Sequence, residues 1–259
     1  MADLLSSLSI TATPGLLAVA FAALVLAYLV FTLAGFGSGL IASAPLALVL
    51  PVARVVPLLA LLDCGSSLRR GWRARDQVVW AELRQLVPGM ATGQVLGVLM
   101  LSRIPPGVMA VLMGTFVAIQ GCRGLMQKRS PSPSALRGGF RPDGAFLRGV
   151  FGGVLGGLFG SGGFVYATYL ERRLEQREAF RATQSVCVAL STAWRLFLCG
   201  TLGFVDGALL AMALACLPAM ILGTFIGHHV DLHLSRERLF LLLHGLLVAS
   251  GVGLILRYV

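Results

Sequence analysis

Charged residues are scarce in this chain. Asp, Glu, Lys and Arg make up 12% of its 259 residues, whereas a typical soluble domain carries about 25%. Hydrophobic residues make up 57%, and the mean hydropathy is +0.85. This composition argues against a soluble protein and predicts one that lies in a lipid bilayer. Five apolar stretches approach or reach the roughly 20 residues that cross a bilayer: residues 16–35, 108–125, 183–202, 208–226 and 239–256.

Acidic residues are particularly few, with 11 Asp and Glu against 21 Lys and Arg, a net charge of +10. In a soluble protein this excess would suggest a nucleic-acid partner. Here the basic residues fall mostly in short loops between apolar stretches, so we expect them to orient the chain in the membrane and expect no nucleic acid. No Lys or Arg precedes residue 16, so the basic n-region of a cleavable signal peptide is missing.

Motifs for redox, nucleotide and hydrolytic chemistry are also missing. The five cysteines form no C-x-x-C pair and have no metal-ligand spacing, which argues against a thiol-redox carrier. The glycine-rich runs lack the preceding strand of a Rossmann site and the Gly-Lys-Ser/Thr of a P-loop. No G-x-S-x-G motif is present. We therefore expect no cofactor, no use of ATP and no enzymatic activity.

What the sequence does contain is an internal repeat. Phe36-Gly-Ser-Gly39 recurs as Phe159-Gly-Ser-Gly162, at an offset of 123. Two further matches follow in the same order, at offsets of 130 and 131: residues 87–97 match residues 217–227, and residues 114–118 match residues 245–249. Three matches in one order at a slowly drifting offset predict a duplicated unit.

The repeat divides the chain into four parts. We expect an N-terminal segment at 1–15, a first transmembrane repeat at 16–126, a linker at 127–144 and a second transmembrane repeat at 145–259. The linker is basic, rich in Ser, Pro and Gly, and lacks hydrophobic periodicity, as is typical of a soluble connection. We expect it to lie in the cytoplasm.

Each half contains a long apolar segment that ends at its glycine run, a shorter piece, a polar break and three further helical pieces. The predicted polar breaks are residues 50–57 and 171–181. The fold class is therefore an all-α polytopic membrane protein with about eight transmembrane helices, plus helix breaks or re-entrant pieces at the glycine runs. Helices interrupted at matching positions of two halves are typical of the binding site of a secondary transporter.

The loop charges favour repeats of inverted orientation. If each half crosses the membrane an odd number of times, one side carries 15 Lys and Arg and the other carries three. An even number gives 10 against 8. The positive-inside rule therefore favours inverted repeats with both termini outside the cytoplasm. Segment length argues the other way, because residues 164–170 are too short to cross alone at about 1.5 Å per residue, unless this piece is re-entrant or continues into the charged run.

The two glycine runs are the first candidate substrate site. A helix that starts after a break offers free N–H groups and the positive end of its dipole, which attract a small anion. The alternative is close helix packing, which Gly93-x-x-x-Gly97 and Gly223-x-x-x-Gly227 are expected to provide. The candidate substrate-binding residues of the runs are Gly37, Ser38, Gly39, Gly160, Ser161 and Gly162.

Charged and polar side chains inside apolar segments are further candidates. Arg195 lies in the middle of one such segment, where a charge costs at least about 2.5–3.5 kcal/mol and requires a partner or a watery cavity. Asp63 lies at a similar depth in the first half, so the two side chains form either a buried ion pair or parts of a substrate site. Gln184 is a further substrate-binding candidate. Arg54 and Asp63 are candidates for coupling or gating.

One cluster suggests a different class of protein. His228, His229, Asp231 and His233 lie within six positions, which raises the alternative of an intramembrane metalloenzyme. The cluster falls between two apolar segments beside basic residues, so an interfacial loop of titratable imidazoles explains it without metal. We expect no metal site.

The two glycine breaks, "GFGSGLIASAPLAL" and "GLFGSGGFVYATYL", with "REAFRATQS" after the second, resemble the sulfite exporter TauE/SafE permeases over residues 16–257. The commoner family form is G-x-G-G-G, whereas Gly35-Phe-Gly-Ser-Gly39 has serine in place of one glycine, and the second copy lacks the first glycine. The resemblance implies transport of a sulfur-containing anion, such as sulfite or an organosulfonate, across the cell inner membrane.

These observations together predict a secondary transporter for a small anion. Backbone N–H groups of the two breaks, the hydroxyl groups of Ser38 and Ser161 and the charge of Arg195 would hold the anion. The two repeats would move around it to give alternating access. Asp63 is the candidate for a proton-linked switch, and the sequence is compatible with a homo-oligomer.

Overall fold

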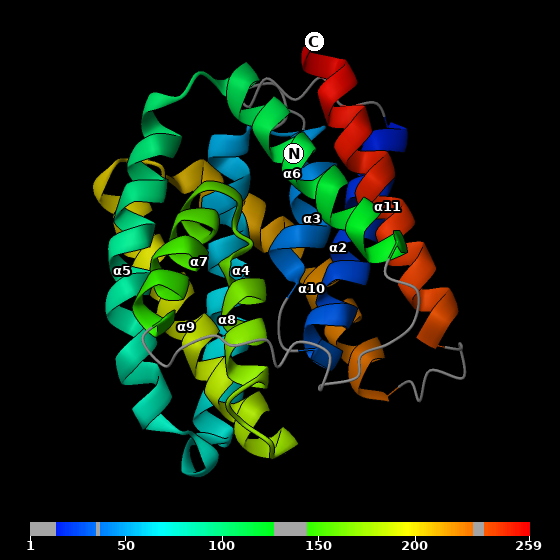
Figure 1. Ribbon diagram of the computed structural model, residues 1–259. Coiled ribbons are helices and arrows are strands. Elements are labelled where there is room, and N and C mark those ends of the chain that lie inside the picture. Colours follow the sequence, from blue (N-terminus) through cyan, green and yellow to red (C-terminus); the bar gives the residue numbers. More distant parts are fainter. Residues whose placement is uncertain (1–13, 35–36, 127–143, 230–235) are drawn as a thin grey trace.

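The computed structural model describes residues 14–34, 37–126, 144–229 and 236–259, and within these ranges it contains ten α-helices and no strand (Figure 1). The helices of the first half are α2 (Pro14–Ala34), α3 (Ser38–Ala47), α4 (Val52–Arg73), α5 (Trp80–Arg103) and α6 (Pro106–Met126). Those of the second half are α7 (Ala145–Phe159), α8 (Gly162–Glu171), α9 (Arg177–Thr201), α10 (Gly207–His229) and α11 (Arg236–Tyr258). A 3-10 turn, η1 (Arg75–Gln77), follows α4. The all-α prediction is confirmed.

Helix length separates the elements into two kinds. Eight helices have 15 to 25 residues, whereas α3 and α8, the helices that follow the glycine runs, have 10 residues each. Among the residues that the structure describes, four helices are long and apolar enough to cross a membrane: Gly15–Leu33, Trp80–Arg103, Pro106–Met126 and Gly207–His229. These features confirm a polytopic membrane protein with short helical pieces at the breaks.

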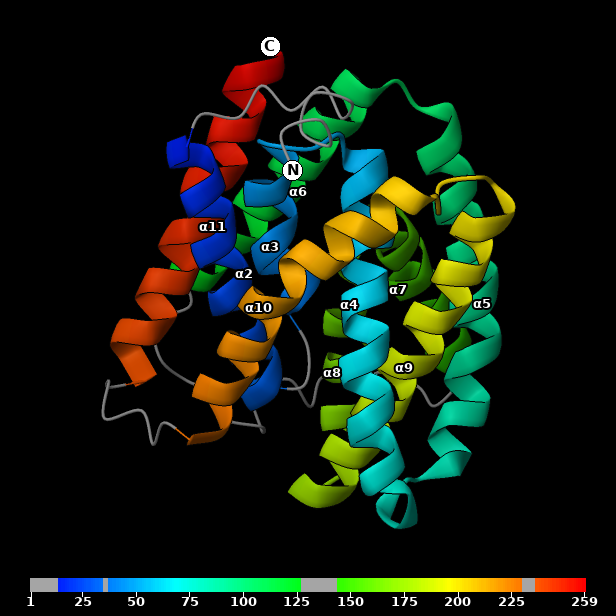
Figure 2. The ribbon, with the colours of Figure 1, turned by 180° about the vertical axis from the view of Figure 1, so that it is seen from behind.

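The halves interleave rather than form two separate lobes. Helix α5 packs along α7, α10 along α2, α4 along α9, and α6 along α11, so each of these pairs joins the first half to the second. Each short helix packs against the helix before it, α3 on α2 and α8 on α7, because the chain turns back at the glycine run (Figures 1 and 2).

Glycines allow two of these helix pairs to approach closely. A Cβ at Gly93 of α5 would lie 2.1 Å from the carbonyl oxygen of Val150 in α7. A Cβ at Gly223 of α10 would lie 2.3 Å from the carbonyl oxygen of Val25 in α2. No side chain fits in either place, so the packing role predicted for these small-residue motifs is confirmed.

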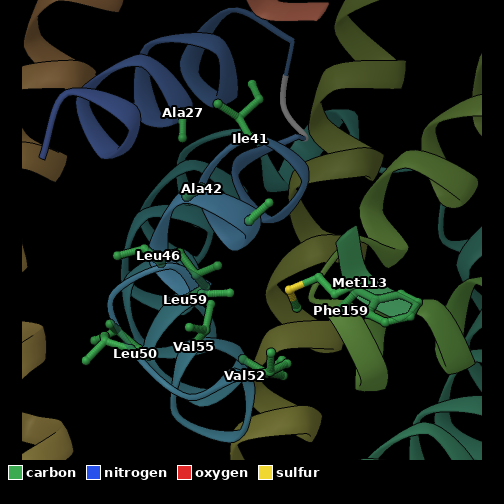
Figure 3. Close-up of a cluster of buried hydrophobic side chains, with 14 of the residues drawn as sticks. Ala27, Ile41, Ala42, Leu46, Leu50, Val52, Val55, Leu59, Met113 and Phe159 are labelled. Atoms are coloured by element: carbon green, nitrogen blue, oxygen red, sulfur yellow. The ribbon is translucent and has the colours of Figure 1, made fainter. Parts of the chain in front are cut away.

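The hydrophobic core surrounds α3. All ten residues of α3 are buried, and Ile41 and Leu46 pack with Leu59 of α4 and Phe159 of α7 (Figure 3). Because protein rather than lipid surrounds this helix, the irregular backbone before it can lie at membrane depth.

Both predicted polar breaks are too long. Helix α4 begins at Val52 and contains Pro57, so only residues 48–51 interrupt the helices. The buried side chains of Val52, Val55 and Val56 hold the start of α4 against the core, which outweighs the single hydrogen bond that Pro57 cannot donate. In the second half only residues 172–176 are not helical, because the charged residues from Arg177 onward form the first turns of α9.

Candidate functional site

The two glycine runs meet in space. Gly37, which precedes α3, has φ of 103°, and Gly160, which follows α7, has φ of 74°. Both values lie in the left-handed region, which glycine adopts without strain. A Cβ at Gly39 would lie 2.1 Å from the carbonyl oxygen of Gly160, so the backbones of the two breaks are in direct contact.

A buried cavity lies where the breaks meet. Its lining joins residues of both breaks with side chains from α2, α4 and α9. They are Phe31, Gly37, Ser38, Gly39, Leu40, Asp63, Gly160, Ser161, Gly162, Gly163, Phe164, Val188, Ser191, Thr192 and Arg195. The structure therefore brings together eight of the residues that the sequence singles out, including Arg195 and Asp63. Gln184 and Arg54 are not among the lining residues.

Asp63 supplies the negative charge of the cavity and is 3% exposed. The Tyr28 hydroxyl donates to one of its carboxylate oxygens and the Ser38 hydroxyl to the other, both at 2.9 Å. A hydroxyl can donate one hydrogen bond, and in this arrangement Ser38 donates it to Asp63.

Arg195 supplies the positive charge and is 2% exposed. Its Nη1 donates to the carbonyl oxygen of Gly156 at 2.7 Å, which fixes the guanidinium, while its Nε is buried without a hydrogen-bond partner. Within the described residues, Arg195 and Asp63 face the same cavity without a direct ion pair. The buried ion pair considered from the sequence is therefore not formed here.

Gln184 lies beside the cavity rather than in it. Its side chain is fully buried, and its Nε2 donates to the carbonyl oxygen of Gly163 at 2.9 Å. This bond attaches the first turn of α8 to α9, so Gln184 positions the second break. The hydroxyl of Ser161, which does line the cavity, makes only a long contact of 3.5 Å to the carbonyl oxygen of Leu155.

Arg54 lies away from the cavity, in an ion pair between the starts of α4 and α10. Its Nη1 is 2.6 Å from both carboxylate oxygens of Asp206, whose Oδ1 also accepts from the backbone N–H of Leu209 at 2.8 Å. These hydrogen bonds, that of Arg54 first, lower the pKa of the Asp206 carboxyl. Sequence reasoning missed Asp206, although an acidic residue directly before an apolar helix is a recognisable N-cap signal.

Other residues of the site also escaped prediction. Tyr28 gave no signal beyond being a hydroxyl-bearing residue within an apolar segment. Ser191 and Thr192 could have been found, because residues three and four positions before Arg195 lie on the same face of a helix. The side-chain amide of Gln94 in α5 donates to the Ser191 hydroxyl and so links α5 to α9.

The histidine cluster is only partly described. His228 and His229 are exposed at the end of α10, and the His229 ring stacks on Phe225 with centroids 4.2 Å apart. Asp231 and His233 lie outside the described residues. Among the residues that the structure places, no three or more His, Cys, Asp or Glu side chains are grouped as a metal site.

Membrane-spanning helices around a buried, charged cavity at two helix breaks define a polytopic membrane protein of the transporter class. The family model described as "Sulfite exporter TauE/SafE" matches residues 20–254, so the chain belongs to this family. Over 231 residues it is 27% identical to the probable sulfite/organosulfonate exporter TauE of Cupriavidus necator, covering 87% of this chain and 88% of that protein. Over 198 residues it is 27% identical to the probable inner membrane transporter protein TsaS of Comamonas testosteroni, covering 76% and 81%. No solved structure matches it significantly.

Proposed function

We propose that this membrane protein is a secondary transporter of a small sulfur oxyanion, sulfite or an organosulfonate, across the inner membrane. The observation that carries the proposal is the cavity shared by both glycine breaks, Arg195 and Asp63. The name of the Cupriavidus relative, a probable sulfite/organosulfonate exporter, indicates the substrate class.

The chemistry of the cavity suits an oxyanion. Arg195 contributes a guanidinium whose Nε has no protein partner, and α3 and α8 both begin at the cavity, at Ser38 and Gly162. Backbone N–H groups at the two helix starts, together with their dipoles, favour negative charge. A charge spread over three oxygens can accept hydrogen bonds from all of these donors at once.

Asp63 provides a means of coupling transport to protons. While Asp63 is ionised, it repels an incoming anion and accepts a hydrogen bond from the Ser38 hydroxyl. When Asp63 is protonated, the repulsion is removed and the Ser38 hydroxyl is released to donate to the anion. Protonation of Asp63 and binding of the anion therefore favour each other.

Alternating access follows if the two halves are inverted repeats. The order of helices is the same in both halves. In Figures 1 and 2, α4 and α9 run in opposite directions along the same core. Contacts support two distinct ends: Glu82 of α5 bonds to Arg173 after α8 at one end, and Arg54 pairs with Asp206 at the other. We call the end that carries Arg173 the basic end. If the basic end lies in the cytoplasm, both termini would lie outside it.

Exchange of radiolabelled sulfite and isethionate in proteoliposomes tests the proposal, with sulfate and acetate as competitors. We expect saturable exchange by the wild-type chain. Arg195→Gln should raise the half-saturating concentration at least about tenfold, because one charge-assisted contact contributes about 1.5–3 kcal/mol. Arg103→Gln, which removes an exposed charge at the end of α5, is the control. No exchange of either anion, or equal behaviour of the two variants, would overturn the proposed site.

A further inference from the structure

Arg70 of α4 repeats the geometry of Arg195. Its Nη1 donates to the carbonyl oxygen of Phe31 at 2.8 Å, as Nη1 of Arg195 does to that of Gly156 at 2.7 Å. In both cases the carbonyl precedes the arginine by 39 positions and belongs to the last turn of the helix before a glycine run. Arg70 is therefore the counterpart of Arg195 in the first half, at an offset of 125.

The rest of the Arg70 guanidinium has no hydrogen-bond partner. Its Nε and Nη2 are buried without a hydrogen bond. These two groups form one edge of the guanidinium, and this edge binds two oxygens of a carboxylate or another oxyanion side by side. Capping the C-terminal end of α2 explains the contact of Nη1 with Phe31, but leaves this edge without a role.

The surroundings of that edge are polar and carry charges of both signs, since Asp63 and Arg181 both act on Arg70. Ser67 is fully buried, lies nearly one turn before Arg70 on the same face of α4, and has a hydroxyl without a partner. Arg181 of α9 donates to the carbonyl oxygen of Leu33 at 2.9 Å, and its charge acts on Arg70. An oxyanion here would relieve the repulsion between two arginines and satisfy the Ser67 hydroxyl.

Phe31 is shared by this place and the central cavity. It lines the cavity, and the Arg70 guanidinium lies 4.1 Å from its ring centroid. Arg70 follows Asp63 by seven residues, which is about 10 Å along a helix. Beyond Arg70, α4 ends at the basic end of the molecule, where α8 also ends (Figure 2).

We propose that Arg70 and Ser67 form a second oxyanion site, which receives the transported anion between the basic end of the protein and the central cavity, with the Phe31 ring as the partition. This site rests on the proposed function, because its ligand is the same sulfite or sulfonate. The pathway then has two arginine binding sites, Arg70 from the first half and Arg195 from the second. The anion passes from one to the other when Phe31 moves.

Exchange of radiolabelled isethionate in proteoliposomes tests the second site through Arg70→Gln and Arg70→Lys. We expect Arg70→Gln to raise the half-saturating concentration about tenfold, the effect of losing one charge-assisted contact. Arg70→Lys should restore only part of the affinity, because an ammonium cannot bind two oxygens side by side. Arg69→Gln, the exposed neighbour on α4, should behave as wild type. If Arg70→Gln lowers the thermal stability but matches Arg69→Gln in exchange, Arg70 only caps α2 and the proposal is overturned.

A second measurement keeps Arg70 in place. In a chain whose five cysteines are replaced, Ser67→Cys is treated with an anionic sulfonatoethyl and a cationic trimethylammonium-ethyl methanethiosulfonate. We expect faster reaction with the anion and protection by methanesulfonate. Absence of both effects in a chain that still exchanges isethionate overturns the second site alone. If the wild-type chain exchanges no anion, the proposed function is overturned, and the second site, which rests on it, is overturned with it.

Discussion

At the residue scale, the hydrogen bonds of Asp63 support the proposed control of anion binding by a proton. Tyr28 and Ser38 each donate to one carboxylate oxygen, so the ionised form is stabilised inside a cavity that would otherwise exclude it. Arg195 and Arg70 both act on Asp63 through their charges without donating to it. An anion that binds to these arginines weakens their attraction for the Asp63 charge, and therefore favours its protonation.

Asp63→Asn should separate exchange from accumulation. Asparagine keeps the size of the side chain but cannot ionise, so isethionate exchange at equal pH should continue while accumulation driven by a pH gradient is lost. Asp76→Asn, an exposed substitution in η1, is the control. Transport that follows the imposed pH gradient as strongly in Asp63→Asn as in the control would exclude Asp63 as the coupling group.

The residues of the site could be predicted to different degrees. Arg195 and Asp63 were recognisable because a charge in an apolar segment is expensive. Arg70 is not recognisable as the counterpart of Arg195 from the sequence, because the offset of 130 that relates residues 87–97 to residues 217–227 places position 65, and not Arg70, opposite Arg195. Their matched hydrogen bonds follow an offset of 125 instead. Breaks and loops of unequal length change the offset along the chain. A sequence comparison gives the offset only where residues match, so it cannot locate a change of offset in the stretch between two matches.

At the element scale, glycine sets the distance between helices. The close approach of α5 and α7 depends on glycines of both helices, since a Cβ at Gly153 of α7 would also lie only 2.4 Å from the carbonyl oxygen of Met90 in α5. The motif was visible in the sequence as small residues four positions apart. Its partner helix was not, because helix pairing depends on which faces meet in space.

Gly93→Ala should therefore destabilise the protein. The added Cβ would meet the backbone of Val150, and the strain of such overpacking costs about 1–3 kcal/mol. Gly65→Ala is the matched control, because Gly65 also lies inside a helix but has open space around its Cβ; alanine should be neutral or slightly stabilising there. Thermal unfolding in detergent measures both. Equal midpoints for the two variants would contradict the proposed role of Gly93.

At the scale of the whole molecule, the order of elements was predictable and their association was not. Hydropathy and the internal repeat predicted eight long helices with two short pieces at the glycine runs. The packing of helices of one half against helices of the other, such as α5 on α7 and α10 on α2, leaves no periodic pattern in the sequence. This packing brings the two glycine runs together, and it explains why a cavity forms at their contact.

Inverted repeats predict that corresponding loops of the two halves lie on opposite sides of the membrane. The α4–α5 loop and the α9–α10 loop correspond in order, and exposed positions in them are Gln77 and Leu202. In cells that carry single-cysteine variants of an otherwise cysteine-free chain, an impermeant maleimide should label Leu202→Cys directly. It should label Gln77→Cys only after the membrane is permeabilised.

Two further positions serve as controls for this experiment. Glu175 is exposed in the α8–α9 loop at the basic end, and Pro105 is exposed between α5 and α6 at the other. Glu175→Cys should follow Gln77→Cys, and Pro105→Cys should follow Leu202→Cys, because each pair shares one end of the molecule. Labelling of Gln77→Cys and Leu202→Cys from the same side would mean that the halves are parallel. Symmetry would then not relate the inward-facing conformation to the outward-facing one. The alternating-access mechanism proposed here would lose its structural basis.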